Sequence, residues 1–171
     1  SVTYDSTYGT LPTVTRTGYS CKWVSGSYNW SSGGSYTPDA VGGATERTMT
    51  ASCTPIIYTI SLDKQSGSGG TGTIYEKYNT GWYSNSGATS SISSVTVPSR
   101  TGYTFGGYYT STNGGGTKII NASGTIVGSN KSFTGNNTIY AKWTPIIYTI
   151  SLDKQSGSGG DTTMYEKYKT G

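Results

Sequence analysis

The sequence predicts an all-β protein made of small tandem units, and two observations carry that prediction. The 171 residues include 30 Thr, 26 Gly, 26 Ser and 16 Tyr, but only six Ala and three Leu. Thr and Tyr suit the pleated surface of a strand and Gly suits turns, whereas Ala and Leu favour helices. The second observation is an internal repeat, because TPIIYTISLDKQSGSGG at residues 54–70 recurs letter for letter at 144–160, with a period of 90 residues.

This repeat divides the chain into three parts. Residues 1–55 are expected to be the carboxyl-terminal part of a first repeat, 56–145 a complete repeat, and 146–171 the strand pair that opens a further repeat. Only 32% of the residues are apolar, so a single large core is not expected. Each unit should instead bury a few aliphatic and aromatic side chains of its own.

Two matching motifs assign the first part to the same repeat. RTGYSCKW at 16–23 matches RTGYTFGGYY at 100–109, and TMTASCTP at 48–55 matches TIYAKWTP at 138–145. The amino-terminal part therefore contains counterparts of the middle and the end of the complete repeat.

Alternating apolar residues predict the strands of the complete repeat. The first, at 56–62, places Ile60 and Leu62 on one face. The SGSGG sequence that follows predicts a hairpin loop, after which 73–78 returns beside the first strand. Pro145 cannot donate to a strand ladder and marks the boundary of the unit. The remaining strands are expected at 92–97, 103–110, 117–120 and 139–143.

Composition also argues against several classes of function. The 12 basic and 8 acidic residues give a net charge of +4 without any basic run, so no nucleic-acid partner is predicted. No apolar stretch is long enough to span a membrane. The chain has no His, and its repeated acids, Asp63/Asp153 and Glu76/Glu166, stand at equivalent places in separate copies. A catalytic carboxylate pair would have to share one pocket, so we expect no enzyme, no metal site and no cofactor.

A family resemblance enters through the same motifs. RTGYTFGGYYT at 100–110, followed by IYAKW at 139–143, resembles the internalin-type B-repeat, also called the Listeria-Bacteroides repeat, of bacterial surface proteins. VTYDSTYGTLPTVTRTGY at 2–19 is similar to the family's usual approach to this core. Two segments, 81–94 and 119–133, make the unit longer than is usual for the family.

The resemblance implies a β-grasp-like module, secretion, attachment to a bacterial cell wall or cell surface, and a spacer or adhesive role without enzymatic activity. It also implies that the aromatic residues of the motifs belong to the core. The core aromatics expected on this basis are Phe105, Trp143, Tyr103 and Tyr58.

The only two cysteines occupy core positions of this alignment. Cys21 stands where the complete repeat has Phe105, and Cys53 stands where it has Trp143. If those aromatic residues touch across neighbouring strands, as core positions of the family would, the two cysteines lie within disulfide reach. We predict a Cys21–Cys53 disulfide, typical of an extracellular setting, against the alternative of two buried free thiols.

Two aromatic pairs are candidates for contact with a ligand or partner. They are Trp82 with Tyr83 and Tyr108 with Tyr109. Neighbours in a strand point to opposite faces, so one member of each pair is expected in the core and the other outward. An outward Tyr would offer a rigid surface with a polar tip to a sugar or a protein.

Two hypotheses of function follow. The first is a structural extracellular segment, a stalk, fibre or adhesin spacer, whose partners are neighbouring repeats or copies of itself. In its sharper form, the strand pair 146–171 of one chain completes residues 1–55 of the next, which builds a head-to-tail filament. The alternative to the filament, which we favour, is that the chain is a fragment of one longer polypeptide in which the same pairing forms in cis. The second hypothesis is an adhesion module that binds a host glycan or surface protein through the outward aromatics.

Overall fold

The computed structural model describes residues 9–35, 48–127 and 133–168. It confirms the all-β prediction, because these residues form strands and no α-helix. One short 3₁₀ turn, η1, covers Thr112–Gly114. The strands are β1 Tyr19–Ser25, β2 Tyr28–Ser31, β3 Thr50–Pro55, β4 Ile57–Asp63, β5 Thr73–Lys77, β6 Gly81–Tyr83, β7 Tyr103–Tyr109, β8 Lys118–Ile120, β9 Asn137–Pro145, β10 Ile147–Ser151 and β11 Thr163–Lys167.

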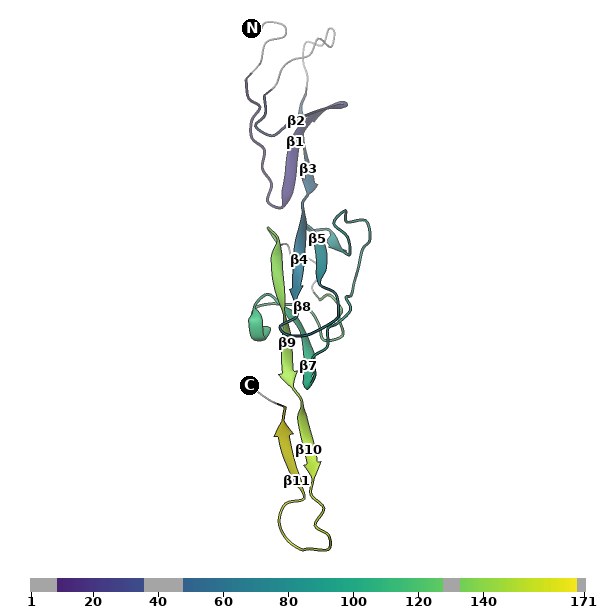
Figure 1. Ribbon diagram of the computed structural model, residues 1–171. Coiled ribbons are helices and arrows are strands. Elements are labelled where there is room, and N and C mark those ends of the chain that lie inside the picture. Colours follow the sequence, from purple (N-terminus) through teal and green to yellow (C-terminus); the bar gives the residue numbers. More distant parts are fainter. Residues whose placement is uncertain (1–8, 36–47, 128–132, 169–171) are drawn as a thin grey trace.

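The strands form three sheets that follow one another along an elongated molecule (Figure 1). The amino-terminal sheet has the order β2-β1-β3, the central sheet has the order β6-β5-β4-β9-β7-β8, and β10-β11 is a two-stranded hairpin. In Figure 1 the amino-terminal sheet and the hairpin lie at opposite ends of the molecule. The three sheets correspond in sequence to the first repeat, the complete repeat and the opening of the next.

The central sheet joins the two ends of the complete repeat. Strand β4 pairs antiparallel with β5, with Ile60 opposite Ile74, as the predicted hairpin requires. On its other edge β4 pairs parallel with β9, where Leu62 lies opposite Ile139. This parallel pair holds the first and last strands of the unit side by side.

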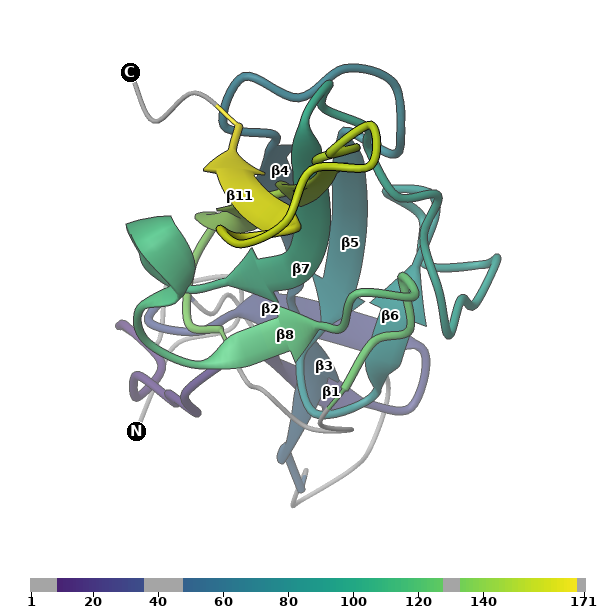
Figure 2. The same ribbon diagram turned by 90° about the horizontal axis from the view of Figure 1, so that it is seen from below.

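Two irregular segments close the central sheet on itself. Beyond β6, the amide of Ile92 donates to the carbonyl of Trp82 at 2.9 Å. The segment at 92–97 is in turn bonded to the segment that follows β8. The amide of Val95 donates to the carbonyl of Gly124 and the amide of Ile126 donates to the carbonyl of Ser93, each at 2.9 Å. Hydrogen bonds therefore continue from β6 around to β8, and the strands in Figure 2 surround a common interior.

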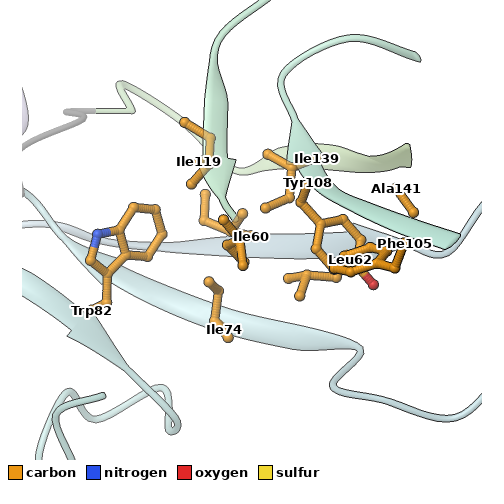
Figure 3. Packing of buried hydrophobic residues seen from close by; sticks show 10 residues of the cluster. Ile60, Leu62, Ile74, Trp82, Phe105, Tyr108, Ile119, Ile139 and Ala141 are labelled. Carbon is orange, nitrogen blue, oxygen red and sulfur yellow. The ribbon is translucent and has the colours of Figure 1, made fainter. Parts of the chain in front are cut away.

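The core of the central unit fills this interior. It contains the buried side chains that alternation predicts from β4, together with inward residues of β5, β7, β8 and β9 (Figure 3). Tyr58 and Trp143 are partly buried against it. The cluster consists of Ile60, Leu62, Ile74, Trp82, Phe105, Tyr108, Ile119, Ile120, Ile139 and Ala141.

Two expectations need correction. The segment 92–97 is not a strand and makes only isolated bridges, whereas β6, which alternation did not predict, is one. Tyr103 is not part of the core cluster, because its ring lies at the junction with the following hairpin, 5.5 Å from the ring of Tyr168. The β-grasp assignment stays a prediction.

Candidate functional site

A cystine and an aromatic pair hold equivalent places in two units. Cys21 lies opposite Cys53 in the β1–β3 ladder, and the two form a disulfide with Cα atoms 4.0 Å apart. Phe105 lies opposite Trp143 in the β7–β9 ladder, with ring centroids 5.4 Å apart. The registers agree with the sequence alignment, so the cross-strand link is covalent in one unit and aromatic in the other.

The Trp143 side chain does more than fill the core. Its indole Nε1–H donates to the carbonyl of Lys64 at 2.8 Å, which ties β9 to the turn that follows β4. A Cβ on Gly67 in that turn would come within 2.6 Å of the indole ring, so the turn passes close over Trp143. A cysteine at this place cannot make either contact. In the central unit Trp143 therefore links β9 both to β7 and to the turn after β4. The disulfide of the first unit links only β1 and β3.

The first junction between units is built from the RTGY motif. Gly18 has a φ of 76°, and a Cβ there would overlap the ring of Tyr78, which belongs to the next unit. The Gly18 carbonyl accepts a 2.9 Å hydrogen bond from Ile56, whose own carbonyl accepts one from Tyr78. Only glycine permits both this backbone conformation and the approach of the ring.

Aromatic and cationic side chains complete the first junction. Tyr19 meets Tyr78 edge to face with centroids 5.6 Å apart. The guanidinium of Arg16 lies 3.8 Å from the centroid of the Tyr19 ring, which is a cation–π arrangement.

The second junction repeats the first contact by contact. Gly102, with a φ of 75°, accommodates the ring of Tyr168 where a Cβ would overlap it. Its carbonyl accepts from Ile146 at 2.9 Å, and the carbonyl of Ile146 accepts from Tyr168 at the same distance. Arg100 lies 4.0 Å over the Tyr103 ring. One joint geometry thus connects the first sheet to the central unit and the central unit to the hairpin.

The structure divides the two aromatic pairs as expected. Trp82 and Tyr108 are buried in the core, so neither is available to a ligand or partner. Tyr83 and Tyr109 are partly exposed. Of the four candidate contact residues, two remain on the surface.

Tyr109 lies between two lysines. The ammonium nitrogens of Lys118 and Lys142 lie 5.3 Å and 5.9 Å from its ring centroid. The aliphatic part of Lys142 also lies against Gly114 of the η1 turn, since a Cβ on Gly114 would come within 2.5 Å of it. The outward Tyr of β7 is therefore partly covered by its own unit.

A buried acid lies in the interior of the central unit. Glu76, on β5, is only 3% exposed, and its Oε2 accepts a 3.0 Å hydrogen bond from the amide of Phe133. Burial raises the pKa of Glu76 to about 7, and the hydrogen bond from Phe133 opposes that rise. Near neutral pH this carboxyl group therefore holds its proton half of the time.

A solvent-open depression of about 600 Å³ lies beside the end of β4. Asp63, Arg100 and Trp143 line it, and each already holds the turn that follows β4. The Asp63 carboxylate accepts from the amide of Gln65 at 2.9 Å, and Arg100 donates to the carbonyl of Gln65 at 3.3 Å. These polar groups stabilise a turn and do not form an acid–base pair.

Tyr108 is buried next to this depression. It pairs in the β7–β9 ladder with Ala141, which lines the depression. Its hydroxyl is the one buried side-chain polar atom without a hydrogen bond in the part of the chain that the structure describes. Burial and the charge of Asp63 raise the pKa of Tyr108 to about 12. The hydroxyl therefore stays protonated, and it is not poised for proton transfer near neutral pH.

Within the ranges described, no group of three potential metal ligands is found, and no helix is long and apolar enough to cross a membrane. Comparisons with protein-family models, curated proteins and solved structures gave no significant match. The repeated junctions are therefore the feature on which a functional proposal can rest.

The junction residues were not singled out as a site from the sequence, although a signal for them was present. RTGY occurs at 16–19 and 100–103, and YEKY occurs at 75–78 and 165–168. Each RTGY precedes the YEKY that it contacts by a similar number of residues. A search for motifs that recur in the same order at a similar spacing would have paired them.

Proposed function

We propose that the chain is a spacer segment of an extracellular protein, in which small β units are held in line by fixed joints. The observation that carries this proposal is the recurrence of one joint, Gly18 with Tyr78 and Gly102 with Tyr168. A binding module needs no repeated joint between units. A stalk does, because its reach depends on each junction resisting bending.

The continuity of the backbone supports the same function. Strand β3 runs into β4 with one residue between them, and β9 runs into β10 in the same way. Each junction also packs a partly exposed tyrosine ring against a glycine and is tied by two hydrogen bonds. A bend at the junction would break these contacts together.

Small-angle X-ray scattering tests the spacer proposal. The wild-type chain should scatter as a stiff rod, and Gly18→Ala or Gly102→Ala should shorten its average length by freeing one joint. Gly159→Ala is the matched control, because Gly159 has the same positive φ of 77° but no neighbour within 4 Å of a Cβ. A wild-type chain as flexible as the joint variants would refute the spacer proposal.

The extracellular location rests on the disulfide and on the resemblance to B-repeats. Disulfides persist mainly in oxidising compartments, and Cys21–Cys53 is a cross-strand disulfide in a small unit. The resemblance extends the proposal to a bacterial cell surface. Digestion of intact source cells with an external protease should remove the protein if it is displayed there, and leave it whole if it is not.

Adhesion through the outward aromatics is the second candidate. Tyr109, placed between two lysines, favours it because a partly exposed ring with cationic neighbours can contact an acidic sugar or protein. Binding on a glycan array that Tyr109→Ala abolishes, with an unchanged melting temperature, would support it. Tyr83→Ala, on the far edge of the sheet, is the comparison variant.

A further inference from the structure

The depression beside the end of β4 belongs to the complete unit. Its volume is about 600 Å³, and its lining residues all lie between Asp63 and Pro145. The hairpin that meets this end of the unit is in place, because the ring of Tyr168 packs at Gly102 as the corresponding ring does in the first joint. The depression is therefore open beside a joint that has formed.

Two groups of opposite charge line the depression, and the fold uses only part of their hydrogen-bonding capacity. The exposed Asp63 carboxylate accepts a hydrogen bond from the amide of Gln65 at 2.9 Å, and a carboxylate can accept several. Arg100 donates one N–H to the carbonyl of Gln65 at 3.3 Å and has further N–H groups. The Tyr103 ring, whose centroid is 4.0 Å from the guanidinium carbon, helps to hold Arg100 in this position. The depression therefore offers a ligand both acceptors and donors.

Trp143 and Asn113 add an apolar wall and an amide to the lining. The indole of Trp143 is fixed, because its Nε1–H donates to the carbonyl of Lys64 at 2.8 Å. Asn113 is an exposed residue of η1, and a side-chain amide both donates and accepts. An aromatic surface with a few polar groups is the usual composition of a small-molecule site.

A buried hydroxyl next to the depression lacks a partner. Tyr108 is fully buried, and among the described residues its hydroxyl is the one buried side-chain polar atom without a hydrogen bond. Figure 3 shows this hydroxyl beside Leu62 and Phe105, whose side chains cannot bond to it. Its ladder partner Ala141 lines the depression. A buried hydroxyl without a partner destabilises the fold, so a polar ligand in the depression that bonds to it is favoured.

We propose that this depression binds one neutral sugar residue of a glycan. Charge favours a neutral ligand, because Asp63 repels a carboxylate or phosphate and Arg100 repels an ammonium group. Sugar hydroxyls both donate and accept, so they match the mixture of Asp63, Arg100 and Asn113. The apolar face of the sugar ring packs on Trp143, and a sugar hydroxyl supplies the partner that Tyr108 lacks.

This site goes beyond the spacer function, which depends on the joints alone. It also differs from the adhesion surface around Tyr109, because Tyr109 does not line the depression. One chain can therefore hold its units in line and bind a glycan with its complete unit.

Titration of the whole chain with simple methyl glycosides, followed by backbone amide NMR shifts, tests the proposal. The probes are the methyl glycosides of glucose, galactose, mannose and N-acetylglucosamine. At least one of them should bind with a Kd of about 1 mM and shift the amides of the turn after β4 and of η1. Asn113→Gly should weaken this binding about fivefold, because glycine accepts the φ of 58° at this position and loses only the amide.

Two further variants and a control make the test specific. Asp63→Asn keeps an acceptor for the turn and should also weaken binding about fivefold, because hydrogen bonds to a charged group are the stronger ones. Tyr108→Phe should weaken binding by a similar factor and raise the melting temperature of the free chain, because it removes the unpaired hydroxyl. Asn79→Gly is the matched control, since Asn79 has a φ of 49° and lies outside the depression, and it should bind as the wild type does.

Three results overturn the proposal. The first is a wild-type chain whose amides do not shift with any of these glycosides. The second is binding that Asn113→Gly and Tyr108→Phe both leave unchanged. The third is binding that Tyr109→Ala abolishes and Asn113→Gly does not affect, which would place the sugar on the other surface.

Discussion

The β4–β5 hairpin and the β10–β11 hairpin share a sequence and differ in their surroundings. Both have the same register, with Ile57 opposite Lys77 in one and Ile147 opposite Lys167 in the other. They also share the same turn, in which Gln65 and Gln155 have φ values of 48° and 46°. Burial separates them, because Leu62 is 4% exposed and its counterpart Leu152 is 42% exposed.

The difference shows which properties of a hairpin are local. Strand register and turn conformation depend on residues within the hairpin and are therefore equal in both copies. Burial depends on β9, β6 and the segments that close the sheet, and among the described residues the central copy alone has these neighbours. Four predictions use this comparison, in order of decreasing effect.

The equivalent strand pairs β1–β3 and β7–β9 should differ in their sensitivity to reductant. Reduction of Cys21–Cys53 should destabilise the first sheet by about 3.5–4 kcal/mol, the chain-entropy value for a 32-residue separation. The central unit should be unaffected, because Phe105 and Trp143 take the place of the cystine there. Denaturant unfolding followed by hydrogen exchange of β1 and β7 measures the two responses. Equal loss of protection in both strands would contradict this prediction.

Truncation of one leucine should be costly only in the covered hairpin. Leu62→Ala should lower the free energy of unfolding by about 3 kcal/mol, because it leaves a cavity in the core. Leu152→Ala, at the same place in the exposed copy, should cost less than about 1 kcal/mol. Urea unfolding at a concentration where the chain is monomeric provides the measurement. A similar cost at both positions would mean that the second hairpin is covered in solution.

The buried acid should make the central unit sensitive to pH. Glu76 has a pKa of about 7 in the folded chain against 4.5 as the ordinary value, so the folded state holds the proton more tightly. Its contribution to stability is complete below about pH 4.5 and is lost as the pH rises through 7. Glu76→Gln should therefore be more stable than the wild type at pH 8, by about 3 kcal/mol, and nearly equal to it at pH 4.5.

Glu166 provides the control for this pH dependence. It holds the same position in β11 but is exposed, so Glu166→Gln should leave the stability within about 0.5 kcal/mol of the wild type. Chemical unfolding at several pH values measures both variants. If the wild type and Glu76→Gln varied with pH in parallel, burial would not be the source of the effect.

The sequence predicted those parts of the fold that depend on the alternation of apolar residues along a strand or on the identical sequence of two repeats. The β4–β5 hairpin and the inward face of Ile60 and Leu62 follow from alternation along each strand. The opposition of Cys21 and Cys53 follows from the repeat alignment together with the resemblance to B-repeats, which implies that the aligned positions touch. These patterns act over short distances or are copied from one unit to another. They could therefore be identified without knowledge of the tertiary structure.

Other features depend on contacts between segments that no pattern connects. The closure of the central sheet uses isolated bridges such as Ser94 with Thr125, between segments that form no continuous strand. Tyr103 lies at a joint instead of in the core, because the next hairpin brings Tyr168 against it. The burial of Glu76 depends on Phe133, 57 residues away, and a charged residue in a short strand is ordinarily expected on the surface.

Removal of the aspartate side chain in the hairpin turn should have the smallest effect on stability of the four changes, and the same effect in both hairpins. The side chains of Asp63 and Asp153 each accept a hydrogen bond from the amide two residues on, Gln65 at 2.9 Å and Gln155 at 3.0 Å. Asp63→Ala and Asp153→Ala should each remove about 1 kcal/mol from this turn and speed amide exchange at the affected glutamine about fivefold. Equal factors are expected because the contact lies wholly within the turn and does not depend on β9. A much larger factor at Gln65 would show that the covering strand also stabilises the turn, through the hydrogen bond from Trp143 to Lys64.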